Sequence, residues 1–432
     1  MTMPEPMTTI ETAVAALGEG PLTEEGLRAH IAPLFSRALA GDTTRGPNGG
    51  PEIYLANHSL GRPLDRTADD IAGALDLWYT DMDGAWSAWL EAMTDYRARV
   101  ARLIGRARPD AVVPKTSAGQ GLRAVLNALP HECPTIVATT GEFDSIDFTL
   151  RMYERRGRAR IKWVKPDENG LFHADAVIEQ IGDVTDLVVV SQAIFATGQV
   201  IEGIGSIVDA ARAHNAEIVV DTYHAAGVMP ISVDDMGVDF AIGGNYKYTR
   251  GGPGACWLAI ADRHLRDAGP SPAGSLVTLD TGWFAKNDTF GYARPETPEL
   301  SAGGDAWLES TPPFLLPYQA RAGLELVEAI GVGRLREYNL AQQQTLAGAL
   351  RERGVEPREI SPRGAFLLVP HPEAMLVSKR LKKAGLNTDA RPCPSGTTAH
   401  VRLCPDICNT DEELTKAAEI VASVVGALTT SP

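Results

Sequence analysis

Residues 217–254, EIVVDTYHAAGVMPISVDDMGVDFAIGGNYKYTRGGPG, contain the two apolar runs that decide the fold. EIVVD (217–221) ends on Asp221, and FAIGG (240–244) runs into a Gly/Pro-rich stretch that holds Lys247. Short, nearly unbroken apolar runs of this kind are typical of buried strands in a parallel sheet. Because ligands bind such sheets at the carboxyl ends of the strands, the stretch predicts a carboxylate and an amine at one ligand-binding edge.

Five further apolar runs extend this pattern on both sides: AVVP (111–114), TIVATT (135–140), RIKWV (160–164), DLVVVS (186–191) and ACWLAI (255–260). Helical patterns such as GLRAVLNAL (121–129) and GIGSIVDAARAHN (203–215) lie between several of them. Strands that alternate with helices predict an α/β fold with a mainly parallel, seven-stranded sheet that is covered on both faces.

The pattern changes near both ends of the chain. The first ~20 residues are predicted to be a loose arm, a helix is predicted to begin after Thr23, and the Gly/Pro-rich residues 41–52 end it. After residue 312, two long helical segments precede a smaller unit in which AFLLV (365–369) and AHVRL (399–403) alternate with helices. We therefore predict an N-terminal arm (1–65) that joins a small C-terminal α/β domain (312–432), with a large domain (66–311) between them.

Composition narrows the class of protein. The 432 residues carry a net charge of −15, and the pI of about 5.1 disfavours nucleic acid or an anionic membrane as partner. The five cysteines are an odd number without paired CxxC spacing, so we expect neither a disulfide framework nor a metal site. The sequence shows neither a signal-peptide pattern nor a stretch of ~18 apolar residues, which favours a cytoplasmic protein.

Asp221 and Lys247 match the chemistry of a pyridoxal 5′-phosphate (PLP) site. A carboxylate against the pyridine nitrogen keeps the ring protonated and strengthens it as an electron sink. A Schiff-base lysine needs a fixed position and a lowered pKa, which the glycine-rich surroundings of Lys247 can provide. The plainer alternatives are an aspartate that caps the next turn and an exposed loop lysine. His224, three residues after Asp221, could orient that carboxylate or touch the cofactor.

A phosphate site is predicted at KTSAGQGLRAVLNAL (115–129). Small residues, among them Ser117, Ala118 and Gly119, run into an apolar helix whose free N–H groups and dipole favour an anion. The segment lacks the GxxxxGK[ST] pattern, which excludes a nucleotide P-loop. Phe143, after the run TIVATT, could stack on a planar ring. An ordinary helix start and a core phenylalanine are the alternatives.

With these residues assembled, the sequence resembles the class V aminotransferase superfamily of fold-type-I PLP enzymes, and within it kynureninase. The resemblance extends from about residue 53 to the last helix. NYKYTRGGPG resembles the kynureninase lysine motif, and DTYHAAG its Asp-x-x-His-x-x-Gly. Weaker matches are IYLANHSLG (53–61), SQAIFATGQ (191–199), TGWF (281–284) and STPPF (310–314).

The resemblance implies roles for individual residues. Lys247 would carry the cofactor, Asp221 would pair with the pyridine nitrogen, and His224 would support Asp221. Arg402 would bind the substrate α-carboxylate, a bidentate task that suits a guanidinium group. Further cofactor contacts would come from Phe143 on the ring face, Ser191 near the ring, Ser117, Ala118, Gly119 and Tyr246 at the phosphate, and Trp283 and Thr311 across the interface of a homodimer with shared active sites.

Several positions depart from the family pattern. His58 replaces the asparagine of Asn-Ser-Leu-Gly, and with Trp283 it is a candidate substrate-binding residue. Lys286 stands where a histidine is expected, and Ile146 where an aspartate is expected. Ala118 and Gly119 lie where hydroxyl residues are usual, and Cys408-Asn409 replaces Tyr-Asn. The cofactor positions match the family better than the substrate positions do.

The function that follows is kynureninase-like hydrolytic Cβ–Cγ cleavage of kynurenine or a related aryl-keto amino acid, which releases alanine. Lys247 would move the Cα proton, and Tyr246 would be a second proton donor or acceptor. Aminotransferase or C–S lyase chemistry remains an alternative. Cys393, nine residues before Arg402, resembles the nucleophile of cysteine desulfurases, although an unreactive loop cysteine is the favoured interpretation. A binding module without PLP is disfavoured because Lys247 and Asp221 are both present.

Overall fold

The computed structural model describes residues 9–269, 275–392 and 399–429. Its centre is a seven-stranded sheet in the order β2–β8–β7–β6–β5–β3–β4, in which only β8 runs antiparallel to its neighbours. The strands are β2 (Val112–Lys115), β3 (Thr135–Thr139), β4 (Arg160–Val164), β5 (Leu187–Ser191), β6 (Glu217–Asp221), β7 (Phe240–Gly244) and β8 (Cys256–Ile260). All seven predicted strands are present, which confirms the predicted sheet.

Alternating side chains on these strands face two separate cores. Val188 and Val220 pack into one core with helix α9, whereas Leu187 and Val219 pack into the other with helices α6 and α7. Successive side chains of a strand point to opposite faces, so runs that are apolar throughout need a cover on both sides. The helices of this part are α4 (Arg66–Thr80), α5 (Ala85–Leu103), α6 (Ala118–Leu126), α7 (Asp144–Arg155), α8 (Ala174–Ile178), α9 (Ile204–Ala213) and α10 (Val233–Met236).

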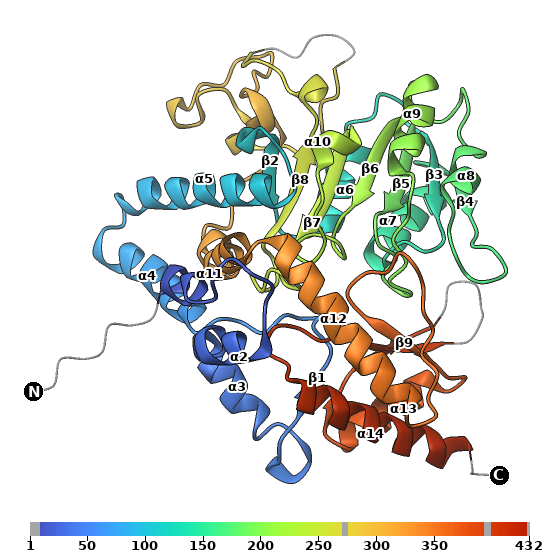
Figure 1. Cartoon of the computed structure of the whole chain (residues 1–432). Helices are drawn as coiled ribbons and strands as arrows, with labels where there is room; N and C mark the ends of the chain where they lie inside the picture. The colour runs from blue at the N-terminus through green and yellow to red at the C-terminus, as the bar shows by residue number, and fades with distance from the viewer. Residues whose placement is uncertain (1–8, 270–274, 393–398, 430–432) are drawn as a thin grey trace, which may run out of the picture.

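The C-terminal part forms a second, smaller sheet with its own core (Figure 1). Its strands β9 (Leu367–Pro370), β11 (Asp389–Arg391) and β12 (His400–Leu403) are antiparallel in the order β11–β12–β9. The helices are α11 (Leu315–Ile330), α12 (Val332–Arg351), α13 (Ala374–Lys383) and α14 (Asp411–Thr429). Strand β1 (Ile53–Tyr54) of the N-terminal segment pairs in parallel with β10 (Leu386–Asn387). We propose that the domain boundaries lie at 1–65, 66–311 and 312–432.

The N-terminal arm is more ordered than a loose segment. Helix α1 (Ile10–Ala15) begins with a capping box in which Thr9 and Thr12 satisfy each other's backbone N–H groups, and Ile10 is buried in one core with residues of α11. The prediction of a loose arm was therefore wrong for this turn, because its short apolar face is covered by a distant helix. The helix predicted after Thr23 is confirmed: α2 (Glu24–Gly26) begins there, a π-helical turn continues it, and α3 (Ser36–Asp42) follows.

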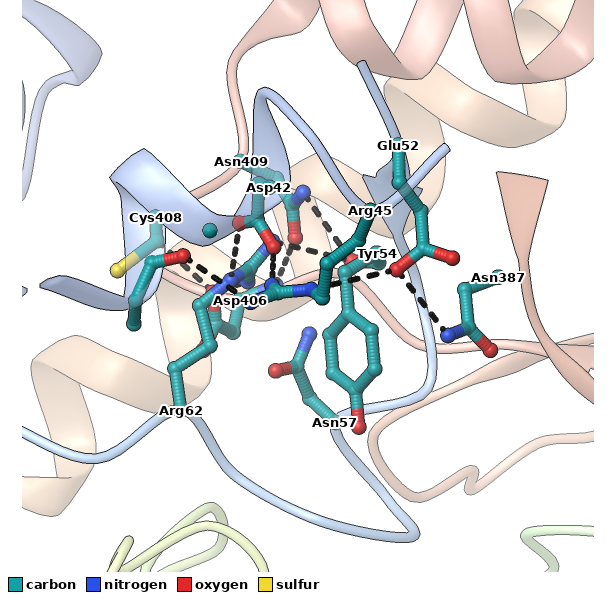
Figure 2. A network of polar contacts seen from close by, with 12 residues as sticks. Asp42, Arg45, Glu52, Tyr54, Asn57, Arg62, Asn387, Asp406, Cys408 and Asn409 are labelled. Carbon is teal, nitrogen blue, oxygen red and sulfur yellow. Dashed lines mark hydrogen bonds and ion pairs between the residues drawn. The ribbon is translucent and has the colours of Figure 1, made fainter. Parts of the chain in front are cut away.

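A buried polar network fixes the next segment, residues 53–62, to the rest of the molecule (Figure 2). Arg62 donates from Nε to Asp42 (3.0 Å) and from Nη1 to Asp406 (3.1 Å). Asp406 also accepts a hydrogen bond of 3.1 Å from Arg250, which lies in the loop after Lys247. One carboxylate thus joins three parts of the chain that are far apart in sequence: the arm, the lysine loop and the C-terminal unit.

No helix within the described residues has both the length and the apolar character needed to cross a membrane. Cys133, Cys256, Cys404 and Cys408 are free thiols, and Cys393 lies outside the described residues.

Candidate active site

A cavity of about 220 Å³ opens where strands β5, β6 and β7 end and helix α6 begins. It brings together residues that the sequence predicted separately: Ser117, Ala118, Gly119, Phe143, Ser191, Asp221, His224, Tyr246 and Lys247. The register of the parallel strands explains part of this, because Ser191 lies beside Asp221 and Asp221 beside Ile242. The predicted residues thus meet in one cavity at the carboxyl ends of these strands.

Lys247 is buried and surrounded by rings. Its Nζ lies 2.6 Å from Nε2 of His224 and over the rings of Phe143, Tyr223 and Tyr246, 4.7 to 5.6 Å from their centroids. Burial lowers the pKa of Lys247 to about 7, although the nearby Asp221 acts in the opposite direction. Much of the amine is therefore unprotonated near neutral pH, which is the nucleophilic form.

Asp221 is also buried, and burial raises its pKa to about 6. Its Oδ1 accepts a hydrogen bond of 2.8 Å from the backbone N–H of Tyr223. No residue in the described part of the chain donates a hydrogen bond to Oδ2, so this oxygen can accept an N–H from a bound ring. A buried carboxylate with one oxygen still free to accept a hydrogen bond is well suited to pair with a pyridinium nitrogen.

His224 contacts the lysine rather than the aspartate. Besides Lys247, its ring lies 3.3 Å from the hydroxyl oxygen of Tyr248, and the described residues include no hydrogen bond between His224 and Asp221. Burial, followed by the charge on Lys247, lowers the pKa of His224 well below its ordinary value. The ring is therefore neutral and can accept a hydrogen bond from Nζ, a different task from the support of Asp221 that the resemblance implied.

The start of α6 provides the anion-binding end of the cavity. Ser117 is the N-cap, and its hydroxyl accepts a hydrogen bond of 3.0 Å from the backbone N–H of Gln120. Ala118 and Gly119 follow in the first turn and line the cavity. A helix N-terminus with small residues lets a phosphate approach the free N–H groups closely. The segment therefore fits the phosphate of PLP without the usual hydroxyl residues at positions 118 and 119.

Sequence reasoning did not identify one buried residue that contacts the site, Glu142. Glu142 accepts hydrogen bonds from the hydroxyl groups of Ser191 (2.6 Å) and Thr139 (2.5 Å) and from the backbone N–H of Ser191 (3.2 Å). Burial raises the pKa of Glu142 to about 7. Its only signal in the sequence is an acid shortly after a buried strand, directly before Phe143. Ser191 thus lines the cavity with its hydroxyl hydrogen already engaged.

Arg402 and His58 lie next to the cavity but do not line it. The guanidinium group of Arg402 donates from Nη1 to the backbone oxygen of Phe195 (2.5 Å), a residue of the cavity wall. Its Nε and Nη2 are both paired with Asp389. His58 is fully buried and lies 2.8 Å from Asp389. No sequence pattern singled out Asp389.

Trp283 and Thr311 lie together, away from the cavity of their own chain. Nε1 of Trp283 donates to Oγ1 of Thr311 (3.0 Å). Trp283 belongs to a cluster of aromatic rings with Trp86, Phe284 and Phe290, and it lines a separate depression with Lys286. Within one chain these residues therefore do not contact the site of Lys247.

A group of possible metal ligands lies elsewhere, at the opposite ends of β6 and β7. Glu217, Asp239 and His264 have ligand atoms within 4.8 Å of one another. Arg263 forms ion pairs with both acids, at 2.5 Å to Glu217 and 2.6 Å to Asp239. The guanidinium group thus already provides the positive charge that a metal ion would supply.

Comparisons with known proteins identify the family. The model of the aminotransferase class-V family matches residues 85–356. The kynureninase of Salinispora tropica is 30% identical over 369 residues, which are 78% of this chain and 83% of that protein. The kynureninase of Deinococcus radiodurans is 27% identical over 358 residues, 79% of this chain and 83% of that protein.

Solved structures show the same architecture. A cysteine desulfurase from Thermococcus onnurineus NA1 has a TM-score of 0.73 at 18% identity, over 87% of this chain and 95% of that one, a likeness that bears on the fold alone. The fold-type-I architecture and the resemblance inferred from the lysine motif are both confirmed. The chain belongs to the class-V aminotransferase family, and within it the chain is kynureninase-like.

Proposed function

We propose that this protein is a PLP-dependent enzyme whose cofactor is held by Lys247. The observation that carries the proposal is the position of a buried amine with a lowered pKa and a buried carboxylate in one cavity, next to a helix N-terminus. The donor set fits the cofactor: Asp221 offers a free oxygen to the pyridine nitrogen, and the start of α6 offers N–H groups to the phosphate. When bound, PLP would supply an electron sink for charge that develops at the substrate Cα.

The protein's own residues would bind, orient and move protons. Lys247 in its neutral form can accept the Cα proton, and His224 holds Nζ at 2.6 Å. Phe143 offers a ring face to the cofactor plane, and its edge-on contact with Phe195 fixes its orientation. The ring of Tyr246 lies over Nζ of Lys247, which makes its hydroxyl a candidate for a second proton transfer.

The reaction that we propose is hydrolytic Cβ–Cγ cleavage of kynurenine or a related aryl-keto amino acid. The support is the similarity to curated kynureninases over more than three quarters of the chain. Arg402 would bind the α-carboxylate, because its guanidinium group lies directly behind Phe195, a residue of the cavity wall to whose backbone oxygen it donates. Several positions that would shape the substrate pocket differ from the family pattern. Ile146, for example, is a core residue here instead of an aspartate.

The test begins with the cofactor. The PLP-loaded protein is reduced with borohydride and digested, and mass spectrometry is expected to find the cofactor mass on the peptide with Lys247. L-kynurenine and 3-hydroxykynurenine are then supplied, and release of the anthranilate product and alanine in equal amounts is the expected result. Lys247→Ala is the matched control. Cofactor on another lysine contradicts the assignment of the site. Cofactor on Lys247 without cleavage contradicts the substrate alone, and S-substituted cysteines and amino-group transfer to 2-oxo acids are then tested.

We also propose a homodimer with shared active sites. The support is an exposed apolar surface at the junction of α4 and α5, where Trp78, Tyr79 and Met82 are exposed, together with Phe290 of the aromatic cluster that holds Trp283. Apolar patches of this kind on a soluble chain mark protein interfaces. Trp283 and Thr311 would reach the cofactor of the partner subunit. Sedimentation as a dimer is expected, and a fully active monomer would contradict the proposal.

A cytoplasmic location completes the proposal. It is supported by the free state of the described cysteines, because thiols stay reduced in that compartment. Fractionation of cells that express the tagged protein tests the location, and recovery with a secreted fraction would contradict it.

A further inference from the structure

Arg402 is paired with a carboxylate of its own chain. Asp389 and Arg402 are direct cross-strand neighbours in β11 and β12. Asp389 accepts from Nε of Arg402 at 2.7 Å and from Nη2 of the same guanidinium group. A bidentate pair of this kind fixes the plane of the guanidinium group as well as its position. The arginine that would bind the substrate is therefore held rigidly before any substrate arrives.

His58 and Ser59 hold Asp389 from the other side. Nε2 of His58 lies 2.8 Å from Oδ1 of Asp389, and the hydroxyl of Ser59 donates to Oδ2 at 2.7 Å. Burial and the positive charge of Arg402 lower the pKa of His58 to about 4. The ring is therefore neutral and donates its Nε2 proton to Asp389. Its Nδ1 is buried and has no hydrogen-bond partner within the described residues.

The segment that carries His58 is itself anchored at both ends. The backbone N–H of Leu55 donates to Asn387 (2.9 Å), and that of Cys404 donates to Leu55 (2.8 Å). At the other end, the N–H of Gly61 donates to the oxygen of Tyr246 (2.8 Å). The network around Arg62 holds the same segment (Figure 2). His58 therefore sits in a fixed bridge between the small sheet and the lysine loop.

Some N–H donors of Arg402 remain available for a ligand. A guanidinium group has five N–H donors. Asp389 takes one on Nε and one on Nη2, and Phe195 takes one on Nη1. One N–H on each terminal nitrogen is left without a partner among the described residues. Two such donors can bind one carboxylate in a bidentate manner.

We propose that His58 and Asp389 are positioning residues that hold Arg402 with its two terminal nitrogens ready for the α-carboxylate of the substrate. This inference rests on the proposed role of Arg402 in binding an amino acid. A neutral histidine at position 58 then determines how strongly Arg402 binds the α-carboxylate. The effect is confined to ligands with a carboxylate, because neither residue lines the cavity that holds Lys247.

The test compares two variants and two ligands. His58→Gln keeps an N–H donor close to the position of Nε2, whereas His58→Leu removes it with a similar volume. L-alanine and ethylamine, which is alanine without its carboxylate, are titrated into the PLP-loaded proteins, and the shift of the visible cofactor band reports binding. His58→Leu is expected to raise the apparent Kd for L-alanine about tenfold, as for loss of one hydrogen bond to a charged group, and to leave that for ethylamine unchanged. His58→Gln should bind both ligands like the unaltered protein.

Other outcomes overturn the inference in recognisable ways. Equal Kd values of L-alanine for the unaltered protein and His58→Leu would show that His58 does not position Arg402. Tighter binding of L-alanine by His58→Leu would show that Asp389 competes with the substrate instead of presenting the arginine. Parallel weakening of L-alanine and ethylamine would indicate general damage to the site. If L-alanine does not shift the cofactor band of the unaltered protein, the proposed role of Arg402 fails and this inference fails with it, whereas failure to cleave kynurenine leaves it standing.

Discussion

Gly61 of the arm packs directly against the lysine loop. A Cβ atom built on Gly61 would lie 2.0 Å from the backbone oxygen of Lys247 and 3.0 Å from Cγ of Arg250. Real Cβ atoms essentially never approach a heavy atom within 3.0 Å. Gly61→Ala therefore requires a movement of at least 3.0 − 2.0 = 1.0 Å, and a backbone atom cannot rotate away as a flexible side chain can.

The size of the effect follows from this displacement. Overpacking of a close contact typically costs about 1–3 kcal/mol of folding stability. A shift of about 1 Å in a catalytic group can lower a rate by about 10²-fold. We therefore expect Gly61→Ala to lower the free energy of unfolding by about 2 kcal/mol and kcat/KM by about a hundredfold.

The assay pairs this variant with a glycine that has room. A Cβ atom on Gly348, inside α12, would meet no atom within 4 Å. Gly348→Ala should raise stability by about 0.5–1 kcal/mol, as for glycine in a helix interior, and leave kcat/KM unchanged. Urea unfolding gives the stability, and release of alanine from the amino-acid substrate gives the rate. If Gly61→Ala unfolds and reacts like the unaltered protein, the arm does not pack on the lysine loop and the reasoning is refuted.

Three further predictions concern the cavity and the exposed surface. The apoenzyme should form its covalent bond with PLP at a rate that rises as the pH passes about 7, because burial lowers the pKa of Lys247 to about 7; a rise only in the ordinary lysine range would contradict this. Glu142 has a raised pKa of about 7 against an ordinary 4.5, so its contribution to stability is complete below pH 4.5 and is lost as the pH rises to 7. Glu142→Gln, which does not titrate, should therefore gain about 3 kcal/mol relative to the unaltered protein over that interval, measured by urea unfolding at several pH values, and a constant difference would refute the assignment. Tyr79→Glu, at an 86% exposed position of the apolar surface, should sediment as a monomer. Phe148→Glu, at a 68% exposed position on α7, should still sediment as a dimer. If both variants sediment as dimers, the interface lies elsewhere.

Local sequence patterns predicted the sheet well because each strand is covered on both faces. A run such as DLVVVS can be buried in only a few ways, and its position between helical segments makes a parallel strand the simplest solution. The same logic applied to Asp221 and Lys247, since Asp221 ends β6 and Lys247 lies in the loop after β7 of the same sheet. The residues at the carboxyl end of a strand are its neighbours in the sequence. The part of the site that contains Asp221 and Lys247 could therefore be predicted.

The residues that sequence reasoning missed act through contacts between distant segments. Asp389 becomes important only because β11 pairs with β12 and brings it against Arg402. Helix α1 is too short to be stable alone, and it forms because α11 covers Ile10. His224 was expected either to orient Asp221 or to touch the cofactor, and its contact with Lys247 depends on how the turn after β6 directs its ring. No local pattern records such pairings, and charge or hydropathy alone does not distinguish them from surface features.

The two groups that would bind an amino acid belong to different sheets. Lys247 follows β7 of the large sheet, and Arg402 lies on β12 of the small one. The arm joins the two parts, because it is hydrogen-bonded to the oxygen of Tyr246 through Gly61 and to Cys404, directly after β12, through Leu55. A substitution in the arm can therefore change how a carboxylate is held without changing the cavity around Lys247. His58 lies in the arm and outside that cavity, so a change at this position would act on the proposed binding of the α-carboxylate and not on the surroundings of Lys247.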